Sequence, residues 1–456
     1  MSIVMKFGGT SVADAAAFAN VARIVAAERE QLPVVVVSAM SGVTDSLLAA
    51  TTSAGASLDD VFKRHNVAAN ELLDDESANR FAAQVESAAD RIDELRKTIR
   101  QHPEQHKSLQ DAVVSFGEML SSALLAEVLK QQGVEARQVD ARRCILTNEE
   151  HTAAAPLLVE TFSQTQNELH PLLESGVVPV LGGFIGATAQ GVTTTLGRGG
   201  SDYTAALLGA ALQTSEIQIW TDVTGVLTAD PRVVPEAQTI ERLSYSEAAE
   251  LAYFGAKVLH PKTIQPAIEG CIPVRICNSR APHEKGTFVG PETKTSPRTV
   301  KAIAHKTGVT TVQITSARML GAYGFLRALF EVFERHRTVV DVVTTSEVSV
   351  SLSLDDASEL PAIVAELEQL GIVRVEKGRA IICVVGEGLR GTPGIAARVF
   401  STISDINVTL ISQGASSINF TFAIEEERVN EAVRRLHTAF FSHHEHKEQK
   451  AQLGVQ

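Results

Sequence analysis

Several segments of the chain combine glycines with charged side chains in a way that suits phosphate or carboxylate binding. The first is Lys6–Ser11 (KFGGTS), where a lysine precedes two glycines. Glycines let backbone N–H groups approach an anion, and a following helix start adds positive charge. The segment matches neither the GxxxxGK[ST] loop nor the GxGxxG loop. Because a Gly-Gly turn before a helix is common, this segment alone leaves both a structural and a functional interpretation open.

A second segment, Thr193–Tyr203 (TTTLGRGGSDY), carries three glycines, one arginine and several hydroxyl groups before an apolar helix expected at Thr204–Leu212. The guanidinium of Arg198 can bind a carboxylate or phosphate through two parallel hydrogen bonds. Asp202 could hold a lysine or Mg²⁺. The alternative is a flexible surface hairpin.

A third segment, Trp220–Arg232 (WTDVTGVLTADPR), follows a strand. Ligands of open α/β sheets bind beyond the carboxyl ends of strands, which would place Asp222 and Arg232 at a nucleotide. Asp-Pro and Thr-Gly are also ordinary turn formers. In Phe254–Pro261 (FGAKVLHP), Lys257 could be a second cation for phosphates or a solvated surface residue.

Two further features have competing interpretations. Glu118, in Ser115–Glu118 (SFGE), opens an apolar helical stretch and could accept a hydrogen bond from a substrate ammonium. A glutamate in the first turn of a helix also simply complements the helix dipole. His443, His444 and His446 lie in a polar terminus, which favours a solvated tail over a metal site.

The elements that must position these residues alternate between strands and helices. Ile3–Phe7 and Val34–Ser38 read as strands around an Ala-rich helix, Ala13–Glu30, with Ser11 and Asp14 in a capping-box spacing. Residues of about Leu58–Lys107 predict a helical insertion. This order predicts a mostly parallel sheet with helices on both faces, and its further strands are expected at Val177–Leu181, Ile217–Trp220 and Pro273–Cys277.

Beyond a polar, proline-containing stretch at Gly290–Arg298 the chain repeats itself. Gly324–Phe330 matches Gly394–Phe400, and Val340–Leu354 matches Val408–Phe422. The pattern predicts two copies of a small α+β unit that pack together or across a dimer.

Bulk composition is that of a globular protein. The 456 residues carry a formal charge of −13, which argues against nucleic acid or an anionic membrane as the main partner. The four cysteines form no CxxC pair, and the N-terminus carries no signal-peptide pattern, so a reducing cytoplasm is expected.

Taken together, these segments resemble the aspartokinase family of the amino-acid-kinase superfamily, monofunctional and of the lysine-sensitive type. The resemblance covers nearly the whole chain, in the family's order, and is carried by KFGGTS at Lys6–Ser11, SAMSGVTD at Ser38–Asp45, SFGE at Ser115–Glu118, TTTLGRGGSDYTA at Thr193–Ala205, WTDVTGV at Trp220–Val226, TADPR at Thr228–Arg232 and FGAKVLHP at Phe254–Pro261.

The resemblance implies a three-layer αβα kinase domain with a mostly parallel central sheet, followed by two ferredoxin-like ACT domains. The expected divisions are a kinase domain at 1–292 with an insertion at about 58–110, a linker at 293–306, ACT domains at 307–380 and 381–445, and a polar tail at 446–456.

It also implies the reaction, ATP with L-aspartate giving ADP and 4-phospho-L-aspartate. Mg²⁺ is expected mainly through the ATP phosphates, without a dedicated protein metal site. The residue roles are implied too: Lys6, Gly8 and Gly9 at the transferring phosphoryl group, Asp202 organising the lysines, Arg198 on the α-carboxylate of aspartate, Glu118 on its ammonium, Thr44 and Ser201 lining the aspartate pocket, and Thr221, Asp222, Arg232 and Lys257 at the nucleotide.

In the C-terminal half the resemblance implies an effector site for L-lysine, with threonine as the second candidate. Asp341 and Glu347 would suit the ε-ammonium; ordinary residues of a dimer interface are the alternative. The site would comprise Met319, Gly324, Phe325, Leu326, Asp341, Thr345, Ser346 and Glu347. A homodimer through the ACT domains, or a tetramer, is expected.

Three positions depart from the family pattern: Leu227 stands where a tyrosine is frequent, Asp45 where an asparagine is frequent, and Val339 where a serine is frequent. Two rival functions remain: a superfamily member acting on glutamate, acetylglutamate, carbamate or a nucleotide, and a catalytically silent amino-acid sensor. The presence of both the KFGGTS and the GRGGSDYTA motifs disfavours the first function, and the intact charged residues disfavour the second function. A fusion to homoserine dehydrogenase is disfavoured by length and by the missing dinucleotide fingerprint.

Overall fold

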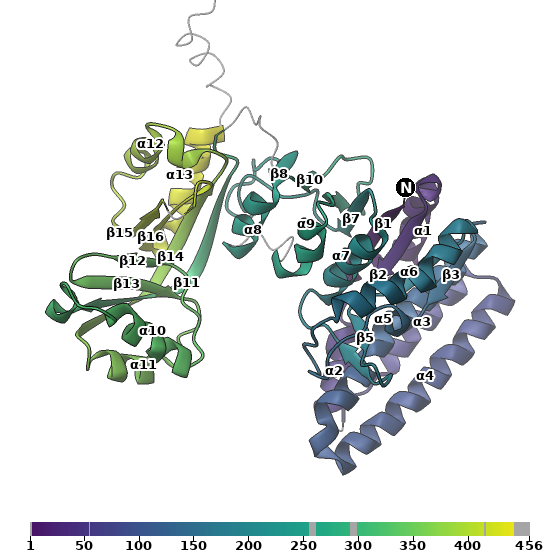
Figure 1. Cartoon of the computed structure of the whole chain (residues 1–456). Coiled ribbons are helices and arrows are strands. Elements are labelled where there is room, and N and C mark those ends of the chain that lie inside the picture. The colour runs from purple at the N-terminus through teal and green to yellow at the C-terminus, as the bar shows by residue number, and fades with distance from the viewer. Residues whose placement is uncertain (1, 54, 255–260, 292–298, 415, 442–456) are drawn as a thin grey trace, which may run out of the picture. The chain divides into compact units, whose positions relative to one another are not determined.

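The structure, a computed structural model, describes residues 2–53, 55–254, 261–291, 299–414 and 416–441. The chain divides into two compact units, which are described separately. The first contains an eight-stranded sheet and its helices, and the second contains a six-stranded sheet together with the segment Leu227–Ile240 and most of α8 (Tyr245–Tyr253) (Figure 1).

The sheet of the first unit has the strand order β3-β4-β2-β1-β7-β9-β10-β8. The strands from β3 to β9 run parallel, whereas β10 is antiparallel to β9 and parallel to β8. Their bounds are β1 Ile3–Phe7, β2 Pro33–Val37, β3 Ala136–Val139, β4 Val178–Gly182, β7 Glu216–Thr221, β8 Arg242–Ser244, β9 Val274–Asn278 and β10 Thr287–Gly290. A separate hairpin joins β5 (Ile185–Ala187) to β6 (Thr193–Thr195).

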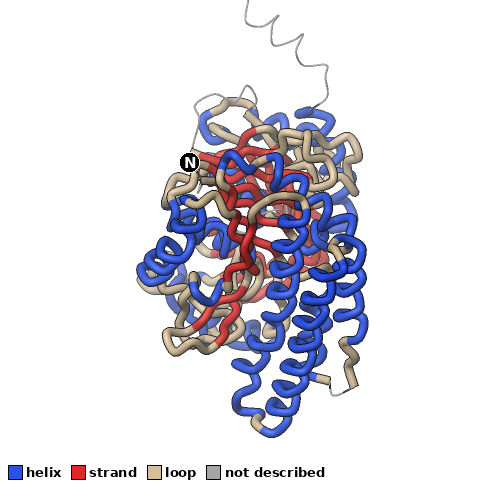
Figure 2. The backbone as a smooth tube through the Cα atoms, turned by 90° about the vertical axis from the view of Figure 1, so that its right-hand side faces the viewer, coloured by secondary structure: helices blue, strands red, loops and turns tan. Residues whose placement is uncertain are grey.

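Helices cover this sheet on both faces, which confirms the predicted three-layer architecture (Figure 2). In β1, Ile3, Met5 and Phe7 join the apolar cluster of α1 and α5, while Val4 is buried outside that cluster. Alternate residues of a strand point to opposite faces, so both faces of β1 are covered. The helices of this unit are α1 Ala15–Ala27, α2 Val43–Thr52, α3 Asp59–Leu72, α4 Asp75–Gln101, α5 His106–Gln131, α6 Leu158–Glu174, α7 Gly200–Leu212 and α9 Gln265–Glu269.

Two predicted helix starts are wrong. The helix expected from Ala13 begins at Ala15, because Asp14 is its N-cap and accepts the N–H of Ala17 at 2.9 Å. The helix expected at Thr204 begins at Gly200.

Helix α5 crosses the centre of the first unit. The stretch Pro103–Gln131 is long and apolar enough to span a membrane, yet 72% of its most apolar window is buried inside the protein. It packs on β2, β3 and β4 and against α2, α3 and α4, so its apolar length is that of a core helix.

The sheet of the second unit has the order β12-β13-β11-β14-β16-β15 and is antiparallel throughout. Its elements are β11 Ala302–Thr315, α10 Phe325–Arg335, β12 Val343–Thr345, β13 Ser349–Leu354, α11 Leu360–Leu367, β14 Ile372–Val385, α12 Ile395–Thr402, β15 Val408–Gln413, β16 Asn419–Glu425 and α13 Val429–Phe441.

The two repeats are interleaved, not sequential. The start of β11, Ala302–Lys306, pairs with Ile381–Val385 of the second repeat, and the remainder of β11 pairs with Ile372–Arg379 and with β13. Residues Ala302–Lys306 were expected in the linker at 293–306. They form a strand because they pair with β14 and because Ile303 is buried in the core of the second repeat.

Candidate active site

A pocket of about 650 Å³ lies beyond the carboxyl ends of β1 and β2 in the first unit. It is lined by the turn after each strand, by the middle of α5 and by the loop that leads into α7. This is the edge of a parallel sheet at which ligands bind in open α/β folds. The pocket brings together seven residues predicted from the sequence: Lys6, Gly9, Thr44, Glu118, Arg198, Ser201 and Asp202.

The ammonium of Lys6 forms an ion pair with Asp202, with 2.7 Å between Nζ and Oδ1. Lys6 comes from β1 and Asp202 from the first turn of α7, and both side chains are largely buried. The pair fixes the lysine head at the pocket wall.

The glycine turn after β1 differs in part from expectation. The N–H of Gly8 donates to the carbonyl of Trp220 at 3.1 Å, so this amide is already engaged within the fold. The other predicted glycine, Gly9, lines the pocket. The turn continues into a four-residue 3-10 helix, Gly9–Val12, not into α1. A Cβ on Gly9 would come within 2.9 Å of the carbonyl oxygen of Ala39, so only glycine fits there.

Glu118 lies in the middle of α5, not in a first turn as predicted. Glu118 is 3% exposed, and its carboxylate accepts a hydrogen bond from the backbone of Ala39. Burial raises the pKa of Glu118 to about 8, against the opposing effect of that hydrogen bond. Within the described part of the chain, Oε2 has no hydrogen-bond partner. A buried carboxylate oxygen without a partner is suited to receive a cationic group from the pocket.

The start of α7 forms the opposite wall. Gly199 is its N-cap with φ 75°, and no side chain caps the first turn, which leaves the positive end of the helix dipole facing the pocket. Arg198 is exposed, and no carboxylate among the described residues pairs with it. Ser38 donates to the hydroxyl of Ser201 at 3.0 Å.

Sequence reasoning missed the glycine pair at the end of β4, in which Gly182 is the last residue of the strand and Gly183 follows it. A Cβ on Gly183 would lie 2.6 Å from Cβ of Ser201, and one on Gly182 would lie 2.9 Å from Cβ of Glu118. These glycines let β4 approach both α5 and α7. The Gly-Gly at the end of a buried apolar strand was the available signal.

The residues predicted to contact the nucleotide do not all belong to the first unit. Phe7 of β1 pairs with Trp220 of the parallel strand β7, and this pairing sets Thr221 beside the glycine turn. The hydroxyl of Thr221 donates to the carboxylate of Asp222 at 3.2 Å. Arg232 belongs to the second unit, where it forms an exposed ion pair with Asp230 at 2.6 Å. Lys257 lies outside the described residues.

The predicted effector residues all belong to the second unit. The N–H of Ser316 donates to the carbonyl of Val348 at 2.8 Å, which joins the segment before Met319 to the turn that carries Ser346 and Glu347. Met319 and Phe325 both pack on the apolar core of the first repeat. Gly324 is the N-cap of α10 with φ 84°, and Leu326 follows in its first turn. Thr345 ends β12.

Asp341, just before β12, accepts a hydrogen bond from the hydroxyl of Tyr253. Burial, the hydrogen bond that protonated Asp341 can donate to Asp355, and the negative charge of Asp355 raise the pKa of Asp341 to about 7. Asp355 is itself paired with Lys306.

Comparison with known proteins agrees with this geometry. The model of the amino acid kinase family matches residues 1–278, and an ACT domain model matches residues 382–440. The lysine-sensitive aspartokinase 3 of Escherichia coli is 37% identical over 96% of this chain and 99% of its own length. The chain belongs to the aspartokinases.

Other relatives match over a similar share of this chain. Aspartokinase 1 of Arabidopsis thaliana, a chloroplastic protein, is 39% identical over 97% of this aspartokinase and 80% of its own length. Among solved structures, E. coli aspartokinase III in complex with aspartate and ADP matches with a TM-score of 0.81 and 36% identity. The match covers 97% of this chain and the whole of the E. coli chain. The same enzyme in complex with lysine and aspartate matches with a TM-score of 0.77.

Proposed function

We propose that this aspartokinase transfers the γ-phosphoryl group of ATP to the side-chain carboxylate of L-aspartate, giving 4-phospho-L-aspartate and ADP. The proposal rests mainly on one observation: a single pocket is bordered by the unpartnered oxygen of buried Glu118, by exposed Arg198 and by the Lys6–Asp202 pair. These groups complement an ammonium, a carboxylate and a phosphoryl group. The complex of the E. coli relative with aspartate and ADP supports the same substrates.

In this proposal the pocket holds aspartate by both ends of its amino-acid group. Arg198 binds the α-carboxylate through two hydrogen bonds, and Glu118 accepts from the α-ammonium. Thr44 and Ser201 line the remaining wall. The side-chain carboxylate then points toward Lys6.

The chemical step needs positioning and charge neutralisation. The aspartate side chain is ionised at neutral pH, so one of its oxygens attacks the γ-phosphorus directly while the bond to the β–γ bridging oxygen breaks and ADP leaves. No general base is required. Lys6 and the Gly9 amide offset the charge of the transferring group, and Asp202 keeps the lysine in place. Gly8 shapes the turn.

Mg²⁺ would be held mainly by the ATP phosphates, where it supplies further charge neutralisation. In the described part of the chain no three His, Cys, Asp or Glu side chains gather to hold a metal ion, and Asp202 is already engaged by Lys6. We propose that Thr221 and Asp222, which lie at and just after the end of β7 in the first unit, contact the nucleotide.

A hydroxamate assay tests this function directly, because hydroxylamine traps an acyl phosphate. With ATP and Mg²⁺ we expect hydroxamate from aspartate, and none from glutamate or without an amino acid. Turnover of glutamate in place of aspartate would replace the proposal with another superfamily activity.

We also propose that this reaction is the first step of lysine, threonine and methionine synthesis and that it takes place in the cytoplasm. We further propose that L-lysine inhibits it through the site around Met319 and Asp341, as the name of the lysine-sensitive relative suggests. Kinase rates in millimolar lysine and in millimolar threonine separate the two effectors: rates that fall only in threonine would reassign the site.

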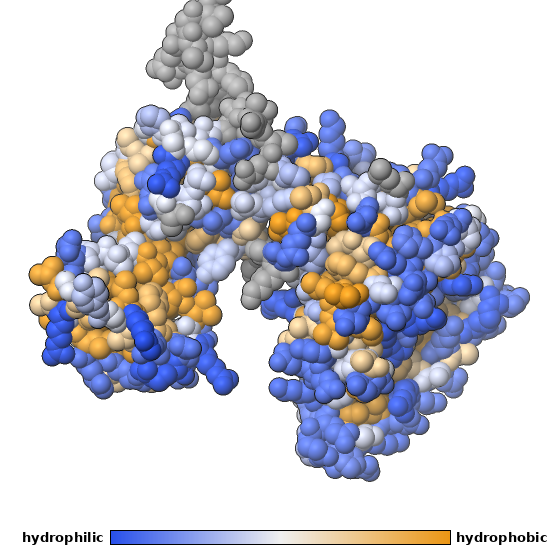
Figure 3. Space-filling view, in the orientation of Figure 1, coloured by the Kyte–Doolittle hydropathy of each residue, from blue (hydrophilic) through white to orange (hydrophobic). Residues whose placement is uncertain are grey.

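We propose a homodimer through the ACT domains. The first part of β14 pairs with β11 on one side, and its pairing with β16 begins only at Arg379, so the other edge of Ile372–Lys377 is open among the described strands. Open apolar edges favour pairing with another chain. Figure 3 shows apolar side chains gathered on this unit; the exposed ones include Leu320, Tyr323, Val339, Val343, Val348, Ile372 and Val375.

A further inference from the structure

Asp111 is a buried carboxylate outside the pocket lining. Its partners lie at the end of β6 and in the turn at His151 and Thr152, and these two segments shape residues 196–199, which carry Arg198 and are called the arginine loop below. Asp111 lies on α5, seven residues before Glu118, and is 0% exposed. Seven residues are about two helical turns, so the two carboxylates lie on one face of the helix, about 10 Å apart along its axis.

All the contacts of Asp111 are close. Oδ1 accepts from the hydroxyl of Thr195 at 2.6 Å, and Oδ2 accepts from the N–H of Thr152 at 2.9 Å and lies 3.0 Å from Nδ1 of His151. Burial raises the pKa of Asp111, against the opposing effect of these hydrogen bonds. A carboxylate so fully satisfied is suited to hold backbone in place, not to bind a ligand.

Thr152 shows that the held segment is constrained. Its φ of 73° is in the left-handed region, which costs a non-glycine residue energy and persists only when surrounding contacts fix it. Its carbonyl oxygen faces Gly197, where a Cβ would lie 3.3 Å away. Gly197 immediately precedes Arg198, so the turn at Thr152 forms the floor of the arginine loop.

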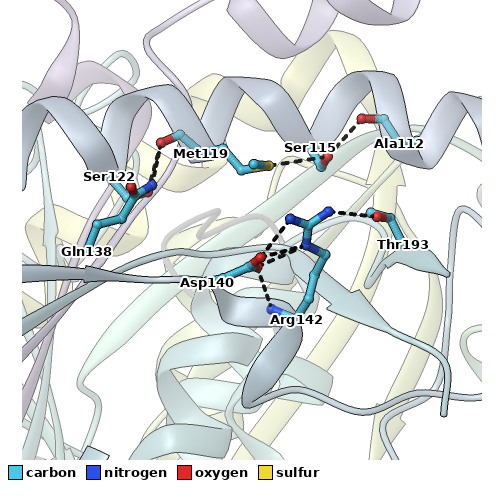
Figure 4. A network of polar contacts seen from close by, with 8 residues as sticks. All are labelled: Ala112, Ser115, Met119, Ser122, Gln138, Asp140, Arg142 and Thr193. Atoms are coloured by element: carbon cyan, nitrogen blue, oxygen red, sulfur yellow. Dashed lines mark hydrogen bonds and ion pairs between the residues drawn. The ribbon is translucent and has the colours of Figure 1, made fainter. Parts of the chain in front are cut away.

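Each threonine hydroxyl of β6 has a different partner. Thr195 bonds to Asp111, Thr194 lies 2.7 Å from the hydroxyl of Thr147, and Thr193 accepts from Arg142 at 3.2 Å. Figure 4 shows this last contact, with Arg142 paired to Asp140 beside the strand. Of these three hydroxyl contacts, the one to Asp111 is the contact that reaches α5, the helix that carries Glu118.

From this geometry we infer that Asp111 is a positioning residue that sets the distance between Arg198 and Glu118, and so the fit of the α-amino-acid group of the substrate. The inference rests on the proposed function, in which these two residues bind the carboxylate and ammonium of aspartate. Asp111 itself touches neither the substrate nor the reacting atoms.

The test compares Michaelis constants in matched variants. We expect Asp111→Asn and Thr195→Val to raise the KM for aspartate by about tenfold or more, because the arginine loop is no longer held at the right distance from Glu118. The KM for ATP should stay within about twofold of the wild-type value. Thr195→Ser keeps the hydroxyl and should restore the wild-type KM. Thr193→Val removes an equivalent hydroxyl on the Arg142 side and should leave both constants unchanged.

The outcomes separate the two proposals. A wild-type enzyme that forms no aspartyl hydroxamate refutes the proposed function. An active wild type whose Asp111→Asn and Thr195→Val variants keep the aspartate KM, or raise both KM values equally, overturns the positioning role. Should Asp111→Asn fail to fold, the Thr195→Val and Thr195→Ser pair decides it alone.

Discussion

Lys6 and Asp202 form a largely buried ion pair of 2.7 Å that joins the end of the first strand to the first turn of α7. The contact ties the phosphate side of the pocket to the amino-acid side, because Asp202 follows Arg198 and Ser201 in the same loop and helix start. A lysine held in this way costs no rearrangement when charge develops on a transferring phosphoryl group.

Lys6→Ala should therefore lower kcat by about 10²–10³ while the protein remains folded. Steady-state kinetics and circular dichroism measure the two quantities. Lys130→Ala is the matched control, since it removes an exposed lysine whose ion pair with Glu127 lies at the far end of α5. Near-normal turnover in Lys6→Ala would remove Lys6 from the mechanism.

The raised pKa of Glu118 predicts that aspartate binding releases a proton. With a pKa of about 8, the free enzyme holds Glu118 neutral at pH 7, whereas an ammonium partner favours the ionised form. Calorimetry in buffers of different ionisation enthalpy should report about one proton released per aspartate at pH 7, and an affinity that rises from pH 6 to 8. Glu118→Gln should bind weakly and without proton release; unchanged release in that variant would assign the proton elsewhere.

The same shift fixes the sign of a stability effect. An unfolded chain loses the Glu118 proton near the ordinary value of 4.5, whereas the folded free enzyme keeps it to about 8. Between these values the folded state binds the extra proton, so this group's contribution to the free energy of unfolding falls as pH rises. Glu118→Gln should flatten that part of the pH profile of the melting temperature.

Local sequence patterns predicted most of the parallel strands of the kinase sheet. β1 lies at Ile3–Phe7 as predicted, and β2, β4, β7 and β9 lie within one residue of the predicted bounds, because short apolar runs between turn signals mark buried strands. β5 and β6 escaped prediction because their three-residue strands are held partly by threonine hydroxyls, which follow no apolar pattern.

Long-range relationships could not be read from the sequence. The repeats revealed two α+β units, yet their interleaving depends on which half of β11 pairs with which half of β14. Asp111 carried no local signature either, since its partners lie 40 to 84 residues further along the chain. The engagement of the Gly8 amide by Trp220 likewise required the register of β1 and β7.

Gly183→Ala should lower activity without changing any charged group. The added methyl would lie 2.6 Å from Cβ and 2.8 Å from Cα of Ser201, so the first turn of α7 must shift. Because a displacement of about 1 Å at a site of this kind can cost roughly a hundredfold in rate, we expect a loss in kcat/KM for aspartate of about that size. Gly391→Ala, where nothing lies within 4 Å, is the control. Equal activity of the two variants would show that α7 tolerates the shift.

Asp341 makes the proposed lysine response dependent on pH. Its pKa of about 7, raised by burial and by Asp355, leaves the carboxyl largely neutral at pH 6 and ionised at pH 8. An ammonium binds the ionised form better, so lysine should inhibit more strongly at pH 8 than at pH 6. The groups that face Asp341 are the Tyr253 hydroxyl and Asp355, the latter paired with Lys306.

Asp341→Asn should then weaken lysine inhibition by about tenfold or more and remove its change with pH, while the uninhibited rate stays near that of the wild type. Asp356→Asn is the matched control, because Asp356 is an exposed carboxylate that accepts a hydrogen bond from the N–H of Ser358. Dose–response curves for lysine at the two pH values measure both effects. A wild-type response to lysine that survives intact in Asp341→Asn would place the ammonium at another carboxylate, with Glu347 the next to test, since it lies in the turn joined to the Met319 segment.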